Sequence, residues 1–531
     1  GVSQHTNGFY NVLGWMTVNM LLGNIDAKGG IIAASTYDTK GKGKGELFDV
    51  TKLAGSGSAF GVSSIRHGVD YEKTTLFEGY PARRNWYPLS SDIYQETIPS
   101  IGDAYPYPVK ALIQYMGAPT YALPAGHTNE EILADVDKLP LFIASDILIG
   151  STSMYADYIF PDLTFLERWE FQGSHPNIPN KVQPVRQPVI GPIPEEASVY
   201  GQSYPISLET LLLGLAEQLA LPGFGADAFG DGLDLRHPDD LYLRQVANLA
   251  YGEEPDGSDA VADADDREVE VFLAARQHLP ASMFDPARWE AIVGSNLWRK
   301  VVTVLNRGGR FEDHADAYDG DRVAHPYGKL VNLYQEKTAK TVHAGTGKRY
   351  PGYATYVPVR DYLGAELDAY RDGYELQLIT HRIISQTKSR TVADPWLSAL
   401  MPENGILLNA SDAERLGLGD GQEVRVVSAT NPRGEWDHGA GNVQPIVGKV
   451  ITTQGIRPGV VSFALGFGHW ATGANDVTID GTIIKGDQRR RKGVHANATM
   501  WTDPTVTNTC LIDPIGGSVS FYDTYVRLET V

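Results

Sequence analysis

Histidines, one cysteine and glycine-rich loops are the residues of this chain that could carry metal, nucleophilic or phosphate chemistry. The 13 histidines include no H-E-x-x-H pair, and no serine stands in a G-x-S-x-G turn, so neither a zinc hydrolase nor an α/β-hydrolase is indicated. The glycine-rich stretches 40–45, 55–61 and 345–348 lack the preceding strand, spacing and following helix of a phosphate-binding loop.

Cys510 is the only cysteine. By itself it offers no iron–sulfur or Cys-type zinc site and no intrachain disulfide, and we expect it to be a small buried residue. The middle third, residues 201–370, contains no recognisable acid–base or nucleophile set. Motifs alone therefore identify no catalytic residue and no metal site.

Length and charge narrow the class of protein. The chain has 531 residues and a net charge of −20, with part of the acid excess in residues 253–266. Such a length predicts two or three domains, and the negative charge disfavours binding to nucleic acid or anionic lipid. No apolar run approaches the roughly 18 residues of a membrane-spanning helix. Because residues 1–5 (GVSQH) show neither an initiator Met nor a signal-peptide core, we expect a fragment or a separately numbered piece.

The first two thirds of the sequence alternate between helical and extended patterns. Residues 7–22 and 109–116 have helical spacing, whereas 139–145 and 157–161 are short apolar runs typical of buried strands. This alternation predicts a doubly wound α/β region over 1–200. Region 201–370 is predicted to be a helical insertion with an acidic loop, with helices at 208–221, 239–250, 267–277 and 289–304.

From residue 376 the pattern changes to short β runs separated by Gly, Pro and Asp turns. Strands are predicted at 376–380, 406–408, 423–428, 447–452, 460–464 and 525–529, with a short helix at 412–417. Many short strands with irregular connections indicate a closed β-barrel over 371–531.

Several segments, read in order, resemble one family: the large subunits of the dimethyl sulfoxide reductase family of molybdopterin oxidoreductases. They are residues 1–30 (GVSQHTNGFYNVLGWMTVNMLLGNIDAKGG), 145–168 (SDILIGSTSMYADYIFPDLTFLER), 378–382 (LITHR), 410–424 (ASDAERLGLGDGQEV), 455–470 (GIRPGVVSFALGFGHW) and 493–514 (GVHANATMWTDPTVTNTCLIDP). Within the family, the segments ERWEFQGSHP (167–176), RRKGVHANATMWTDP (490–504) and DPIGGSVSFYDTYVRLE (513–529) look most similar to tetrathionate reductases, with respiratory arsenate and selenate reductases next.

The resemblance implies a fold and a cofactor. The fold is a doubly wound α/β region, a helical insertion and a carboxy-terminal barrel of the double-psi type. The cofactor is a pair of molybdopterin guanine dinucleotides around one molybdenum or tungsten. Burying such a ligand demands many hydrogen bonds, because an unpaired buried polar group costs about 1–3 kcal/mol. Polar residues and glycines at strand ends suit this purpose.

The resemblance also implies which residues bind the cofactor. They are Thr380, His381, Arg382, His469, Trp470, Asn497, Asp146, Gln4 and His5. Plainer interpretations stay open: a surface strand end for Thr380–Arg382, a packed core for His469 and Trp470, an Asx turn for Asn497 and a helix cap for Asp146. His175 is better explained as a loop residue, and Asp157, Glu167 and Arg168 as ion-pair candidates.

The implied function is two-electron reduction of an inorganic oxyanion or sulfur compound in anaerobic respiration, with tetrathionate placed first. The family's molybdenum ligand and 4Fe–4S cluster are expected in an amino-terminal half that this chain lacks, so the catalytic residues are unknown. The resemblance further implies two partners, a membrane anchor subunit plus a ferredoxin-like iron–sulfur subunit, with a periplasmic location after export in folded form.

Two alternatives belong to other classes. The chain could be a scaffold that keeps the fold without the cofactor, in which case it need not retain the polar set Thr380, His381, Arg382, His469 and Asn497. It could also be an unrelated α/β enzyme with a site in residues 201–370, which is ranked last.

Overall fold

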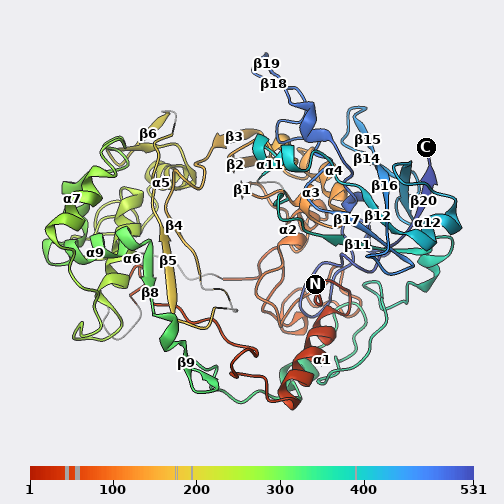
Figure 1. Ribbon diagram of the computed structural model, residues 1–531, viewed down its shortest axis with the longest axis horizontal. Coiled ribbons are helices and arrows are strands. Elements are labelled where there is room, and N and C mark those ends of the chain that lie inside the picture. Colours follow the sequence, from red (N-terminus) through yellow and green to blue (C-terminus); the bar gives the residue numbers. More distant parts are fainter. Residues whose placement is uncertain are drawn as a thin grey trace. The chain divides into compact units, whose positions relative to one another are not determined.

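The computed structural model describes residues 1–41, 47–53, 55, 60–173, 175, 178–192, 195–388 and 391–531, so the glycine-rich stretches 40–45 and 55–61 lie largely outside the described residues. The chain forms two compact units (Figure 1). Unit 1 contains Gly1–Thr17, Gly61–Ile159 and Asn332–Val531, and unit 2 contains Val18–Phe60 and Phe160–Val331. The units are interleaved along the chain, whereas 1–200, 201–370 and 371–531 are contiguous stretches of sequence. In the part that the structure describes, no helix combines the length and apolarity needed to cross a membrane.

A closed six-stranded barrel forms the last part of unit 1. Its strands, in hydrogen-bonded order, are β11 (Leu376–His381), β17 (Val460–Ala464), β12 (Ile406–Asn409), β16 (Val447–Thr453), β13 (Glu423–Ser428) and β20 (Tyr525–Thr530). Inward side chains such as Leu378, Val426 and Phe463 alternate with outward ones and form one apolar core. The barrel predicted from the strand pattern is confirmed.

A three-stranded sheet has two strands in unit 1 and a third that runs from unit 1 into the start of the next segment of unit 2. Strand β1 (Leu112–Tyr115) pairs in parallel with β2 (Phe142–Asp146), and β3 (Tyr158–Pro161) completes the order β1-β2-β3. Helices α2 (Thr97–Gly102) and α4 (Glu130–Leu133) contribute to the apolar cluster that packs against Phe142. The predicted mixed α/β class is confirmed, and so are the strands expected at 139–145 and 157–161.

The helix predicted over 109–116 was wrong. Residues 112–115 form β1, and their exposure alternates along the strand as the side chains of an extended segment do. Apolar residues at 109, 112, 113 and 116 also satisfy helical spacing, so the periodicity of this short segment was ambiguous.

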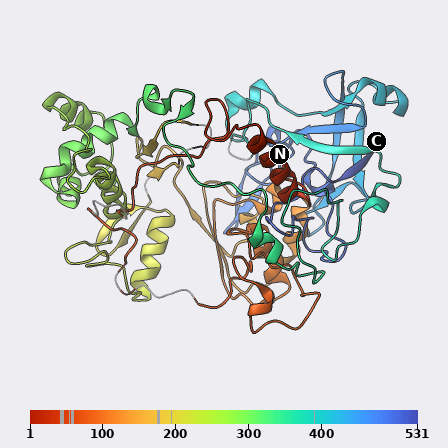
Figure 2. The same cartoon turned by 90° about the horizontal axis from the view of Figure 1, so that it is seen from below.

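Unit 2 is built mainly from helices (Figure 2). These are α5 (Leu208–Gln218), α6 (Pro238–Tyr251), α7 (Asp266–Ala274), α8 (Pro286–Val293) and α9 (Ser295–Arg307). The N-cap predicted at Ser207 is confirmed, because its hydroxyl accepts the Thr210 N–H in a capping box. The last four helices share a core that contains Leu243, Phe272 and Val301, so the helices predicted in this region are present.

The remaining elements are short, apart from one helix. Helix α1 (Gly8–Leu21) agrees with the helix predicted over 7–22. The other helices are α3 (Pro119–Ala122), α10 (Glu336–Lys340), α11 (Pro395–Leu400) and α12 (Ala410–Leu416). The other strands are β4 (Glu170–Phe171), β5 (Val182–Arg186), β6 (Glu196–Val199), β7 (Gln202–Pro205), β8 (Gly309–Phe311), β9 (Tyr318–Asp319), β10 (Arg322–Val323), β14 (Glu435–Asp437), β15 (Val443–Pro445), β18 (Val477–Ile479) and β19 (Thr482–Ile484).

Candidate functional site

A stack of aromatic and imidazole rings lies buried in unit 1. We call it the histidine–aromatic cluster, and it consists of Tyr121, Trp436, His438, His469, Trp470 and His495. The Tyr121 ring lies between His469 and His495, with ring centroids 4.2 and 4.0 Å away and nearly parallel planes. His438 stacks on Trp470 at 4.6 Å.

Glycines allow the loops that carry these rings to touch. His469 follows β17 through Gly466 and Gly468, whose φ angles are +99° and +63°. A Cβ atom on Gly468 would lie 2.8 Å from the backbone nitrogen of His495, and one on Gly466 would lie 2.7 Å from the carbonyl oxygen of Lys388. Both the positive φ and the close approach therefore require glycine here.

Several polar atoms in and beside the cluster have no hydrogen-bond partner among the described residues. They are both ring nitrogens of His469, Nδ1 of His438, Nε2 of His495, Oδ1 of Asn497, Nδ1 of His127 and Oδ1 of Asn129. The carbonyls of Lys388 and Gly466 lie near the His469 ring without reaching hydrogen-bond geometry. Since each unpaired buried group costs about 1–3 kcal/mol, the described chain leaves this site short of partners.

Burial keeps these histidines neutral. It lowers the pKa of His469 and of His127 to about 4. It also holds the pKa of His495 well below its usual value, and the nearby His469 adds to that effect. A neutral imidazole has one N–H donor and one acceptor nitrogen. At neutral pH His469 and His495 therefore offer uncharged donors and acceptors among flat rings.

Three of the residues predicted to bind cofactor meet at this cluster. His469 and Trp470 belong to it, and the amide nitrogen of Asn497 donates to the carbonyls of Tyr121 and Ala122, both at 3.2 Å. This contact leaves the amide oxygen of Asn497 as the unpaired atom. The amide therefore both fixes the Tyr121 segment and presents an acceptor.

Asp146 is the last residue of β2. The loop that follows it contacts the His469 loop, because the Thr472 N–H donates to the Ile149 carbonyl at 2.7 Å. The Asp146 carboxylate accepts from the Ser153 hydroxyl at 3.0 Å and from the Ile147 N–H at 2.8 Å. Burial raises the pKa of Asp146, and these bonds oppose the rise. Asp146 thus stabilises the turn that contacts the His469 loop.

Thr380, His381 and Arg382 lie at the carboxyl end of β11. Because β11 and β17 are parallel, with His381 opposite Ala464, this end of the barrel also carries the His469 loop. His381 Nδ1 is 2.7 Å from the Ser462 hydroxyl, Thr380 is buried and Arg382 is exposed. The segment therefore presents an exposed guanidinium at the barrel mouth.

Gln4 and His5 contact the segment 521–523 of unit 1. His5 Nδ1 lies 2.7 Å from Asp523 Oδ1, and the Phe521 N–H donates to the Gln4 carbonyl at 3.1 Å. These contacts hold the first residues against residues 521–523, and the role of Gln4 and His5 toward a cofactor stays a prediction.

Asp157 and Glu167, expected as ion-pair candidates, accept backbone N–H groups of Phe142 and Thr164, respectively. His175 is exposed.

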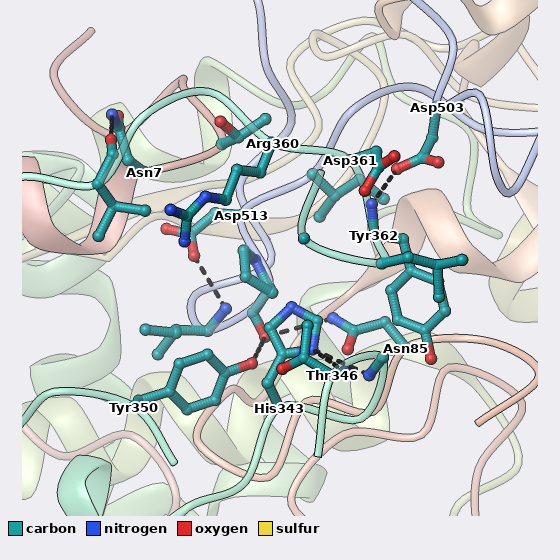
Figure 3. Close-up of a pocket in the computed structure, with 18 of the residues that line it drawn as sticks. Asn7, Asn85, His343, Thr346, Tyr350, Arg360, Asp361, Tyr362, Asp503 and Asp513 are labelled. Atoms are coloured by element: carbon teal, nitrogen blue, oxygen red, sulfur yellow. Dashed lines mark hydrogen bonds between the residues drawn. The ribbon is translucent and has the colours of Figure 1, made fainter. Parts of the chain in front are cut away.

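None of the nine predicted residues lines a cavity of about 610 Å³ in unit 1, although Thr6, the neighbour of His5, does. Figure 3 shows part of its lining, including Asp503, which accepts the Tyr362 N–H at 2.7 Å. The charged lining residues are Arg84, Lys348, Arg349, Arg360, Glu96, Asp361, Asp503 and Asp513. Burial raises the pKa of Asp513 to about 6. Asp503 and Asp513 lie in the family-like segment 493–514, whereas the other charged lining residues come from segments far apart in the sequence that no motif marks.

Cys510 also lines this cavity and is buried, as predicted. Burial raises the pKa of its thiol to about 12, so the thiol stays protonated and unreactive at neutral pH. Among the described residues, no three His, Cys, Asp or Glu side chains gather as ligands for a metal ion. The histidine–aromatic cluster is thus suited to hydrogen bonding and ring packing.

Comparison with known proteins assigns a domain to the barrel. The family described as "Molydopterin dinucleotide binding domain" matches residues 376–494, which include β11–β17 and the His469 loop. A selenate reductase subunit from Mesobacillus selenatarsenatis is 43% identical over 100% of this chain and 50% of its own length. The corresponding tetrathionate reductase subunits are 30% identical in Salmonella typhimurium (99% of this chain, 50% of the relative) and 31% identical in Archaeoglobus fulgidus (89% and 43%). The chain spans about half the length of the curated relatives it matches.

The cluster fits a molybdopterin in its chemistry. A pterin is a flat heterocycle with N–H donors and carbonyl and ring-nitrogen acceptors, and the cluster supplies flat rings and unpaired atoms of both kinds. His469, His495 and Asn497 are the residues that would hold it. The fold, the matched domain and the relatives along the chain agree: this chain belongs to the dimethyl sulfoxide reductase family of molybdopterin oxidoreductases and contains its molybdopterin dinucleotide-binding region.

Proposed function

We propose that this chain binds the paired molybdopterin guanine dinucleotides of a molybdenum- or tungsten-dependent reductase that acts on an oxyanion of selenium or sulfur. The observation that carries the proposal is a set of buried, unpaired polar atoms. They belong to His469, which lies within the matched residues 376–494, and to His495 and Asn497, which follow directly after them. The cofactor supplies the two-electron redox chemistry, and the protein supplies binding and orientation.

The chain's own residues have separable roles in this proposal. His469 and His495 provide neutral donors and acceptors, because burial keeps them deprotonated. Asn497 provides an acceptor oxygen, and Tyr121 keeps the two imidazoles parallel. The exposed guanidinium of Arg382 at the barrel mouth is suited to a phosphate of the dinucleotide.

Selenate is the first substrate to test, and tetrathionate is the second. Similarity over the whole chain supports this order, with 43% identity to a selenate reductase subunit but 30% to a tetrathionate reductase subunit. The sequence motifs alone placed tetrathionate first. Arsenate is the third candidate. A scaffold without cofactor is disfavoured, because it would leave the cluster's polar atoms buried and unpaired.

The rest of the enzyme is proposed on the family resemblance. The remainder of the large subunit would supply the molybdenum ligand and the 4Fe–4S cluster. A membrane anchor and an iron–sulfur electron-transfer subunit would complete a periplasmic respiratory enzyme. These proposals concern the whole protein, of which this chain corresponds to about half.

The test uses the full-length large subunit purified with its partner subunits. Metal analysis is expected to find stoichiometric molybdenum or tungsten. Oxidation of a reduced viologen dye is expected to show a kcat/KM for selenate at least about 10-fold above those for tetrathionate and arsenate. A higher value for tetrathionate would reverse the order of substrates. Absence of both metals, or of reduction with all three substrates, would overturn the proposal.

A pair of variants links this activity to the cluster. The double variant His469→Phe/Asn497→Leu loses several hydrogen bonds to the cofactor, each of about 1–3 kcal/mol. We therefore expect its metal content to fall by about 10-fold or more. The amount of pterin released on denaturation, measured by fluorescence, should fall by the same factor. His314→Phe, on an exposed histidine of unit 2, is the matched control and should retain both. Equal retention by the double variant would remove the cluster from cofactor binding.

A further inference from the structure

A β-hairpin of unit 1 projects from the loop that follows His469. It consists of β18, an Asp480-Gly481 turn and β19, and it forms a sheet of its own that no third strand joins among the described strands. Figure 1 shows β18 and β19 at the top, beyond the other labelled elements of unit 1. A ribbon of two strands is only marginally stable when water surrounds it, so this hairpin is suited to pairing with something else.

The hairpin exposes aliphatic side chains on both of its faces. Ile479 and Ile484 are 40% and 50% exposed, and the register places both on the face that also carries Val477. Ile483 lies on the other face and is 59% exposed. Four of the six strand residues are therefore aliphatic in a part of the surface where no apolar core covers them.

The register also fixes which backbone groups point outwards. Ile479 and Thr482 flank the two-residue turn and form a hydrogen-bonded pair, so the next pair, Thr478 and Ile483, is a non-hydrogen-bonded pair. The N–H and C=O groups of Ile483 therefore point away from β18, and those of Thr478 point away from β19. Each outer edge can accept a further strand through these groups.

The edge of β19 is complementary to itself. Residues 480–485 read D-G-T-I-I-K, with an acid at one end, a base at the other and isoleucines between them. An antiparallel pair of two such edges, centred on Ile483, places the two Ile483 side chains opposite each other. Lys485 then lies opposite Gly481 of the second copy and next to its Asp480, which the flexible lysine stem can reach.

The edge of β18 is not complementary to itself. The same antiparallel arrangement centred on Thr478 would place Asp476 directly opposite Asp480 of the second copy. Like charges in opposite positions destabilise a pair of strands. Self-association through the hairpin therefore favours β19 over β18.

We propose that β19 pairs with β19 of a second copy of this chain, in antiparallel orientation about a two-fold axis at Ile483. The two hairpins then form one four-stranded sheet. The contact is small, and contacts of this size are typical of weak, reversible association. The proposal goes beyond the proposed function and does not depend on it.

Charge near the hairpin favours this partner. The chain has a net charge of −20, so two copies repel each other at long range. Residues 485–492 (KGDQRRRK), however, contain five basic residues and one acidic residue. Antiparallel pairing brings the acidic turn of each hairpin to the base of the other, where this basic segment begins. Lys485 pairs with Asp476 at 2.6 Å, but this exposed ion pair is weak enough to exchange.

A lipid surface fits the hairpin less well than a second copy does. The outward N–H and C=O groups of β19 would find no partners in a lipid environment, and the acidic chain is repelled by anionic lipid. A second β19 edge satisfies these backbone groups and covers the isoleucines at the same time.

Disulfide cross-linking of the full-length large subunit, purified with its partner subunits, tests the register. The Cα atoms of a hydrogen-bonded antiparallel pair are about 5.5 Å apart, which suits a disulfide. Ile483→Cys should therefore form a covalent dimer of large subunits under mild oxidation, and peptide mass spectrometry should find the two introduced thiols joined. Thr478→Cys, exposed on the other edge, is the matched control and should cross-link at least about 10-fold more slowly. Equal rates, or a disulfide from Ile483→Cys to any other protein or segment, would overturn the proposal.

Sedimentation of the same enzyme over a range of concentrations tests the association itself. The unaltered enzyme should show a reversible doubling of mass. Ile483→Asp places two carboxylates opposite each other and should raise the dissociation constant by about 10-fold or more, whereas Thr478→Asp should leave it within about 2-fold. A single mass at all concentrations, or the same dissociation constant in Ile483→Asp, would contradict the proposal. Neither experiment depends on bound cofactor or on reductase activity, so its failure is distinguishable from failure of the proposed function.

Discussion

Two buried polar clusters, one in each unit, differ in whether the chain satisfies them. In unit 2, Asp239 is fully buried, and its carboxylate accepts from the indole N–H of Trp169 at 3.0 Å and of Trp289 at 2.8 Å. Arg288 donates to the same carboxylate at 2.7 Å. In unit 1, the ring nitrogens of His469 and Nε2 of His495 have no such partners among the described residues.

The difference separates structural polar groups from ligand-binding ones. Burial alone does not distinguish Asp239 from His469, since both are almost inaccessible to solvent. Their hydrogen bonds do distinguish them, because Asp239 has partners and the ring nitrogens of His469 have none among the described residues. Asp239 stabilises its own unit, whereas the histidine–aromatic cluster gains its missing bonds when a ligand binds.

The largest expected effect is on unit 2. Asp239→Ala leaves the charge of Arg288 and two indole N–H groups without their acceptor, and should lower the free energy of unfolding by about 3–5 kcal/mol. Asp263→Ala is the control. It removes an exposed carboxylate 3.1 Å from the Lys300 amine and should cost about 0–1 kcal/mol. Denaturant unfolding followed by circular dichroism measures both, and equal losses would refute the structural role of Asp239.

The second effect is a pH dependence of unit 1. The pKa of His469 falls from 6.5 in the unfolded chain to about 4 in the fold, so its neutral form is favoured by folding. The stability it contributes is complete above pH 6.5 and is lost as the pH falls to about 4. The expected loss is about 3 kcal/mol in the cofactor-free protein.

The His469→Phe variant isolates this contribution. Between pH 6.5 and 4 the free energy of unfolding of this variant should fall less steeply than that of the unaltered protein. The difference between the two slopes should be about 1.4 kcal/mol per pH unit, which corresponds to one proton. Denaturant titrations at a series of pH values measure the slopes. Identical slopes would show that His469 is not held neutral by the fold.

A matched pair of substitutions gives the third effect. In the cofactor-free protein at pH 7, His469→Phe removes unpaired polar atoms and should be neutral or stabilising by up to about 1–3 kcal/mol. His237→Phe removes a ring whose nitrogens lie 3.1 Å from the Asp239 N–H and 3.0 Å from the Ser282 carbonyl, and should destabilise by about 1–3 kcal/mol. Thermal unfolding measures the pair, and the same sign for both would erase the contrast between the clusters.

The smallest effect on stability is expected at the barrel mouth. Arg382 is exposed, so Arg382→Ala should change the free energy of unfolding by no more than about 0.5 kcal/mol. Any loss of cofactor in this variant would then reflect a missing phosphate contact. A large loss of stability would instead show that the guanidinium is a structural partner.

The sequence was informative where one pattern dominates a segment. Alternating apolar residues identified the barrel strands, and capping residues such as Ser207 identified helix starts. Segment 109–116 fits two periodicities, and the packing that selected a strand is contributed by distant residues. Local pattern cannot supply that information.

The candidate site shows the same limit. His469, Trp470 and Asn497 belong to motifs and could be identified, and His495 stands two residues before Asn497 in the same segment. Tyr121 could not be found, because it reaches the cluster from a part of the chain more than 300 residues away. Gln4 and His5 also belong to a segment that resembles the family, but in the structure they contact residues 521–523.

An experimental structure of the full-length large subunit with its cofactor tests the central claim most directly. The account predicts pterin nitrogen or oxygen atoms at about 2.7–3.2 Å from the ring nitrogens of His469 or His495 and from Oδ1 of Asn497. A cofactor bound elsewhere, with these three side chains still unpaired or bonded only to water, would contradict it.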